Sequence, residues 1–160
     1  KAGEDDVFAR RGLIPGQIAD YEPKQRPKGA KKPHETTVAC CVSVTQCGNF
    51  GLVGYTCGRI DRYNLQSGMH RGTYCEGGHE SAVYGLAVDA LNETMISGGY
   101  DGEILFWDFE KKVVKGRVSL ESPVNQMVLH REGGLLVVSA DDLRVRLIDI
   151  SNRKIVRCFE

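Results

Sequence analysis

Three residues in the middle of the chain have the side chains of a hydrolase triad, namely His79, Ser97 and Asp101. In such a triad an imidazole removes the proton from a serine hydroxyl, and a carboxylate orients the imidazole. That chemistry requires a serine on a sharp, exposed turn with backbone N–H groups around it. Ser97 lies instead within the run TMISGG, which reads as a strand with buried neighbours. We therefore interpret the three residues as structural and expect no enzymatic activity.

The elements that must position these residues recur along the chain. Residues 39–65, 83–109 and 124–150 align without a gap. Each copy has apolar residues at its first, fourth and sixth positions: Ala39, Val42 and Val44; Val83, Leu86 and Val88; Val124, Met127 and Leu129. A fourth apolar position follows at Ile60, Ile104 and Val145. A repeat of about 40 to 45 residues, with a Gly-His pair before it and a Trp-Asp pair near its end, is typical of a four-stranded propeller blade.

The middle copy resembles the blades of WD-repeat proteins. In those blades a His before the first strand, a Ser or Thr in the second strand, an Asp in the following turn and a Trp in the third strand form a buried chain of hydrogen bonds. The resemblance assigns this structural tetrad to His79, Ser97, Asp101 and Trp107. It implies that Asp101 accepts from the imidazole N–H and that the Ser97 hydroxyl links the imidazole to the indole N–H, so that no buried donor stays unpaired.

The first and third copies depart from the tetrad. Copy one has Val53, Cys57 and Tyr63 at the Ser, Asp and Trp positions, and copy three keeps only Asp142. Apolar packing between neighbouring blades holds such a fold, and the tetrad only adds to it. We therefore predict an all-β fold, a WD-repeat β-propeller fragment of about three four-stranded blades over residues 36–160.

Strand positions follow from the same alignment. For the middle blade we predict strands at residues 83–88, 94–98, 103–109 and 113–118, with turns between them. The runs LLVVSA and EILFWDF are apolar on both sides, which favours blades covered on both faces by neighbours. Three blades make an open wedge, whereas propellers close with typically four to eight. We therefore expect the chain to be part of a longer protein.

Composition argues against several kinds of site. The net charge is zero and the sequence pI is about 7.1, so no global field favours nucleic acid or membrane. The six cysteines include no C-x-x-C pair, which suits reduced thiols in an intracellular protein and gives no zinc spacing. No G-x-x-x-x-G-K-S/T loop and no apolar run approaching 18 residues occur. We expect no cofactor, no metal, no small-molecule substrate and no membrane segment.

The first 35 residues have a different composition. Four of the five prolines lie there, and we predict a Pro/Lys-rich linker or the tail of a preceding blade. This segment holds the one basic cluster along the sequence, formed by Lys24, Arg26, Lys28, Lys31 and Lys32. Two interpretations stay open, a solvated loop between blades and a contact with RNA phosphates.

Five stretches outside the WD consensus carry a more specific resemblance: SVTQCGNFGLVGY, IDRYNLQSGMHRG, AVDALNE, VLHREGGLL and LIDISNRKIVRCF. They resemble the U-three-associated protein twenty-one family, the WD-repeat subunit of the UTP-B subcomplex of the small-subunit processome. The similarity runs from about Thr37 to Phe159 and points to part of the second propeller of that family.

The resemblance implies a scaffold in the nucleus and nucleolus. Such a scaffold would contact other UTP-B proteins and help to dock the box C/D small nucleolar ribonucleoprotein on pre-rRNA, supporting 18S rRNA maturation and small-subunit assembly. The alternative is a generic WD-repeat peptide-binding adaptor of a ubiquitin-ligase or chromatin complex. An adaptor would use a partner-binding rim made by turns, for which the candidates are Tyr55, Tyr100, Asp141 and Asp142.

Overall fold

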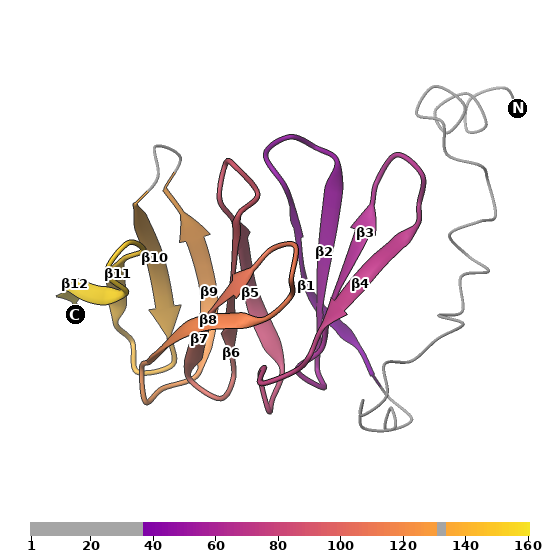
Figure 1. The fold of residues 1–160 in the computed structure, drawn as a ribbon. Helices are drawn as coiled ribbons and strands as arrows, with labels where there is room; N and C mark the ends of the chain where they lie inside the picture. The colour runs from indigo at the N-terminus through magenta and orange to yellow at the C-terminus, as the bar shows by residue number, and fades with distance from the viewer. Residues whose placement is uncertain (1–36, 131–133) are drawn as a thin grey trace, which may run out of the picture.

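The computed structural model describes residues 37–130 and 134–160, and these residues form twelve strands and no helix. The strands make three four-stranded antiparallel sheets that stand side by side like the leaves of a fan (Figure 1). The first sheet holds β1 (Ala39–Val44), β2 (Phe50–Tyr55), β3 (Ile60–Asn64) and β4 (His70–Tyr74). The second holds β5 (Val83–Val88), β6 (Thr94–Gly99), β7 (Glu103–Asp108) and β8 (Val114–Ser119). The third holds β9 (Val124–Leu129), β10 (Leu135–Ala140), β11 (Val145–Asp149) and β12 (Lys154–Phe159).

The predicted fold class is confirmed. The three sheets begin at Ala39, Val83 and Val124, the first apolar positions of the three aligned copies. The prediction for β7 was one residue too long at its end. Phe109 lies in the β7–β8 turn, just beyond the end of the strand, although its N–H still donates to the carbonyl of Glu93 at 3.0 Å in the register of the β6–β7 ladder. The predicted boundary at residue 35 falls outside the described residues and stays a prediction.

Corresponding strands occupy corresponding places in the three sheets, with the first strand of each sheet on the inside of the fan and the last strand on the outside. In every sheet the order in space is the order in sequence. The first strands lie together, because β5 contacts both β1 and β9. The last strands, β4, β8 and β12, therefore form the far edges of their sheets (Figure 1).

Two apolar cores form between the three sheets, and β7 contributes to both. Leu105 and Trp107 pack with residues of the first sheet such as Leu52, Ile60 and Tyr74. Ile104 and Phe106, which point to the opposite face of the strand, pack with residues of the third sheet such as Val124, Leu136 and Ile148. The prediction that EILFWDF is covered on both faces is confirmed. Each fully buried large side chain contributes about 1.5 to 3 kcal/mol to this packing.

The same prediction for LLVVSA stays a prediction. Along β10 the side chains of Leu136, Val138 and Ala140 are buried, and those between them are half-buried. The described residues place a sheet on one side of β10 only, so they test the covering of one face of that strand.

Polar contacts tie neighbouring sheets together near their outer edges. The Phe109 carbonyl accepts from the Arg62 guanidinium at 2.8 Å and from the Tyr74 hydroxyl at 2.7 Å. Lys112, which has a φ of 59°, lies directly over Gly72 of the first sheet. Gly72 itself has a φ of 117°, a backbone conformation that favours glycine.

Candidate functional site

The structure brings the four tetrad residues into one hydrogen-bonded chain. Nδ1 of His79 lies 3.0 Å from each carboxylate oxygen of Asp101. Its Nε2 lies 2.7 Å from the Ser97 hydroxyl, and that hydroxyl accepts from the Trp107 indole N–H at 2.8 Å. With the Nδ1–H donated to the carboxylate, Nε2 accepts from the hydroxyl, and each of these hydrogen-bonding groups has a partner. The chain joins the loop before β5 to β6, β7 and the turn between them.

Burial decides the protonation of this histidine. The His79 side chain is fully covered, and its desolvation lowers the pKa below the ordinary value of 6.5, an effect that the Asp101 carboxylate partly opposes. Asp101 also accepts from the backbone N–H groups of Glu80 and Glu103, each at 3.1 Å. The carboxylate therefore fixes both the imidazole and the two segments on either side of it.

The geometry of Ser97 does not suit a nucleophile. Ser97 is 0% exposed, and its hydroxyl is bonded on one side to the imidazole and on the other to the indole. A hydrolase requires a hydroxyl that an acyl substrate can reach and backbone donors beside it. Neither condition is met at Ser97, which lies inside β6 between two covered faces.

In the third sheet the residue that corresponds to Asp101 of the tetrad, Asp142, forms an ion pair with Arg146. The Asp142 carboxylate accepts from the Arg146 guanidinium through both of its oxygens, and Arg146 is only 7% exposed. The hydrogen bonds from Arg146 lower the pKa of Asp142 to about 2. The carboxylate predicted for a partner-binding rim is therefore already engaged within its own sheet.

The first sheet has a different polar cluster. Asp61 is 3% exposed and accepts from the Thr73 hydroxyl at 2.6 Å. The Arg59 guanidinium lies 3.1 Å from the same carboxylate, and Nε2 of His70 lies 3.4 Å from it. The Tyr63 ring, which stands at the position of Trp107, packs edge-on against His70 with ring centroids 5.4 Å apart.

Sequence reasoning missed both of these clusters, although the alignment held a signal. Asp61 and Arg146 occupy the position that Leu105 has in the middle copy, where the side chain enters the core. A charge at a core position must be paired to be buried. Such a residue in an ungapped repeat alignment therefore predicts a local ion pair.

The remaining predicted rim residues differ in exposure and in the side chains that they contact. Tyr100 is 51% exposed and packs edge-on against Tyr84 at a centroid distance of 6.2 Å. Tyr55 is half-buried beneath the Arg59 guanidinium, which lies 4.5 Å from its ring centroid. Asp141 is exposed. The sequence did not indicate Tyr84, which bulges out of β5 between Val83 and Gly85.

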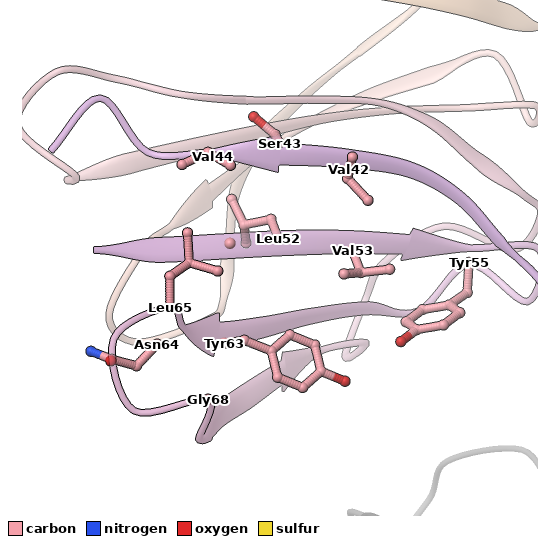
Figure 2. Close-up of a pocket in the computed structure, with 11 residues that line it drawn as sticks. Val42, Ser43, Val44, Leu52, Val53, Tyr55, Tyr63, Asn64, Leu65 and Gly68 are labelled. Atoms are coloured by element: carbon pink, nitrogen blue, oxygen red, sulfur yellow. The ribbon is translucent and has the colours of Figure 1, made fainter. Parts of the chain in front are cut away.

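A cavity of about 440 Å³ lies on the outer face of the first sheet. Figure 2 shows Val42, Val53 and Leu65 lining it together with the rings of Tyr55 and Tyr63. Val42 and Tyr63 correspond to Leu86 and Trp107, which pack against the first sheet from the second. The cavity therefore lies on the face that, one sheet further along, contacts a neighbouring blade.

Other groups that could do chemistry do not assemble into a site. All six cysteines are free. Among residues 37–130 and 134–160, no three His, Cys, Asp or Glu side chains are placed to hold a metal ion. Within the same residues no helix is long and apolar enough to cross a membrane. The predicted RNA-contacting residues Lys24, Arg26, Lys28, Lys31 and Lys32 lie outside the described residues.

The profile of the WDR36/Utp21 second beta-propeller domain matches residues 19–160. The chain belongs to the WDR36/Utp21 family. The match begins at residue 19, before Thr37, where the resemblance noted in the sequence starts. This family membership confirms the resemblance inferred from the five non-consensus stretches.

Individual relatives agree with the family profile. The chain is 43% identical to human WD repeat-containing protein 36 over 84% of its own length and 15% of the relative's. It is 40% identical to U3 small nucleolar RNA-associated protein 21 of Saccharomyces cerevisiae over 72% of its own length and 12% of the relative's. The chain therefore spans only about a seventh of the length of these relatives.

A solved structure supports the fold independently. The crystal structure of RRP9 WD40 repeats superposes with a TM-score of 0.72 at 17% identity, covering 80% of this chain and 40% of that one. At that identity the likeness concerns the fold alone. It shows three consecutive WD-type blades, as the sequence register predicted.

Proposed function

We propose that this chain is part of a non-catalytic WD-repeat scaffold of the small-subunit processome, which supports 18S pre-rRNA processing and ribosomal small-subunit assembly. The observation that carries the proposal is its membership of a family whose yeast relative is named a U3 small nucleolar RNA-associated protein. The fold agrees with this role, because WD-repeat propellers commonly present surfaces to partners. Fold alone gives no function, so the family match decides.

The absence of catalysis is supported by the tetrad. His79, Ser97 and Asp101 have the side chains of a triad, but their hydrogen bonds close on Trp107 inside the protein. We propose that the tetrad stabilises the middle blade and thereby helps to hold the first and third blades, which pack against its two faces, in place. Apart from this set, the described residues hold no arrangement of a nucleophile, a base and an oxyanion site that would favour an enzyme.

The partners that we propose are other UTP-B proteins, with the box C/D small nucleolar ribonucleoprotein and pre-rRNA in the same particle. The protein would therefore concentrate in the nucleolus. Tyr100, Asp141 and Asp142 are the exposed members of the predicted rim. Because Asp142 is bonded to Arg146, Tyr100 and Asp141 remain candidates for a protein contact. The basic cluster of residues 24–32 remains a candidate for a phosphate contact.

Affinity purification of the tagged full-length protein tests this proposal. We expect UTP-B proteins and U3 RNA to co-purify, and imaging of the same tag to show nucleolar signal. Recovery of a ubiquitin ligase or a chromatin complex without U3 RNA would favour the adaptor instead. Replacing Lys24, Arg26, Lys28, Lys31 and Lys32 with Ala should weaken salt-sensitive RNA recovery if that cluster contacts phosphate, and unchanged recovery would leave it a solvated loop.

A further inference from the structure

Positive charge collects on the outermost strands of all three sheets. The strands β4, β8 and β12 contain five Lys or Arg residues and no Asp or Glu: Arg71, Lys115, Arg117, Lys154 and Arg157. The first two strands of every sheet contain no charged residue at all. We call these five residues the basic rim. They are far apart in the sequence, and only the strand order brings them to one edge of the fan.

The basic rim is accessible and largely unneutralised. All five side chains are exposed. Within the described part of the chain, neither Arg71, Arg117, Lys154 nor Arg157 has an acidic partner within 4 Å. Lys115 reaches Asp108 only at 4.0 Å, and an exposed pair of that length contributes little. Binding an external anion would therefore break few existing ion pairs of these cations.

Two of the cations occupy a repeated structural position. Arg71 is the unpaired residue where β4 bulges opposite Arg62 and Tyr63. Lys115 is the unpaired residue where β8 bulges opposite Phe106 and Trp107. A bulged residue leaves the ladder and bends its strand, so neighbouring blades present a cation at equivalent places on successive edges. The equivalent bulged residue of β12 is Val156, so the cation recurs on the first two blades. A cation repeated from one blade to the next suits a partner whose negative charge also repeats.

The composition of two of the three edges favours a polyanion over a protein. The strands β4 and β8 expose no large hydrophobic side chain, whereas β12 exposes Ile155, Val156 and Phe159. Stable protein interfaces depend on buried apolar or aromatic anchors, which β4 and β8 do not offer. We propose that the basic rim binds the sugar-phosphate backbone of RNA. This inference rests on the proposed function, which places the protein in an RNA-containing particle. Because phosphate contacts position a protein without reading bases, the binding is independent of RNA sequence.

Salt dependence measured on matched variants of the full-length protein tests the rim. One variant removes charge (Arg71→Gln, Lys115→Gln, Arg117→Gln and Lys154→Gln), and its control keeps charge (Arg71→Lys, Lys115→Arg, Arg117→Lys and Lys154→Arg). The probes are a single-stranded poly(U) RNA and a polyaspartate peptide, titrated by fluorescence anisotropy over a series of salt concentrations. Four lost phosphate contacts on a single strand should make the slope of log K against log salt shallower by about 3.

We expect the charge-removing variant to show that shallower slope and the charge-keeping variant to match the wild type. Equal slopes for all three proteins would overturn the proposal. Loss of polyaspartate binding without loss of RNA binding would assign the rim to an acidic protein. Aggregation of the charge-removing variant through its strand edges would show that the cations only prevent edge pairing. If RNA binding weakens as expected but U3 RNA never co-purifies from cells, the rim stands and the proposed function fails.

Discussion

Replacing Ser97 with Ala tests the hydrogen-bonded tetrad most sharply. The substitution removes one oxygen atom from a site that is 0% exposed. It leaves the Trp107 indole N–H without the acceptor that now lies 2.8 Å away and His79 Nε2 without the hydroxyl at 2.7 Å. Each unpaired buried group costs about 1 to 3 kcal/mol.

The assay is hydrogen exchange of the β6 and β7 amides in the full-length protein, which reports the free energy of local opening. One unpaired group should lower the protection of those amides roughly 5-fold to 150-fold. The matched background is Trp107→Phe, which removes the indole N–H itself. In that background Ser97→Ala leaves one unpaired group fewer, so its effect should shrink by about 1 to 3 kcal/mol.

Equal effects of Ser97→Ala in the two backgrounds would refute the reasoning. That result would mean that the hydroxyl and the indole do not interact. A second refutation would be unchanged protection in the single variant, since no buried donor could then depend on Ser97.

Three further predictions follow from burial and charge. Burial lowers the pKa of His79 below 6.5, so as the pH falls below 6.5 the unfolded state binds a proton that the folded state does not, and the folded state loses stability. Protection of the β6 amides should therefore fall below pH 6.5 in the wild type but not in His79→Gln. Because Arg146 holds the pKa of Asp142 at about 2, below its ordinary 3.8, the urea midpoint should fall as pH drops from 3.8 toward 2. Asp142→Asn should make that fall smaller, with the remainder due to Asp108 and Asp149, whose pKa values are also lowered. Residues 37–160 expressed alone should bind a hydrophobic dye, since Val42 is 75% and Val156 is 61% exposed, and a monodisperse monomer without dye binding would contradict this.

The sequence predicted the strands well because the repeat is ungapped. Once Ala39, Val83 and Val124 were aligned, every apolar position and every turn in one copy constrained the other two. The tetrad contacts could also be predicted, because their spacing belongs to WD blades in general. The end of β7 was missed by one residue because Phe109 is buried like the strand residues before it and its N–H still bonds in the register of the β6–β7 ladder, so residue type does not separate it from the strand.

Other features depend on strand order in space. The basic rim joins residues from Arg71 to Arg157, and no window of the sequence shows them as a cluster. The polar clusters around Asp61 and Arg146 replace the tetrad by different chemistry, so a search for WD residues passes over them. The coverage of EILFWDF on both faces was predicted correctly, and for LLVVSA, which has the same apolar pattern, the described residues supply a neighbouring sheet for one face only. Sequence pattern shows that a face is apolar, and only the neighbouring sheet decides whether it is buried.

The processing of ribosomal RNA after depletion of the full-length protein tests the central claim most directly. Pulse labelling should show loss of mature 18S rRNA and accumulation of its precursors, with the large-subunit rRNAs made at their usual rate. Re-expression of the wild-type protein should restore 18S rRNA, which ties the defect to this protein. Normal 18S maturation after complete depletion would contradict the scaffold role in small-subunit assembly.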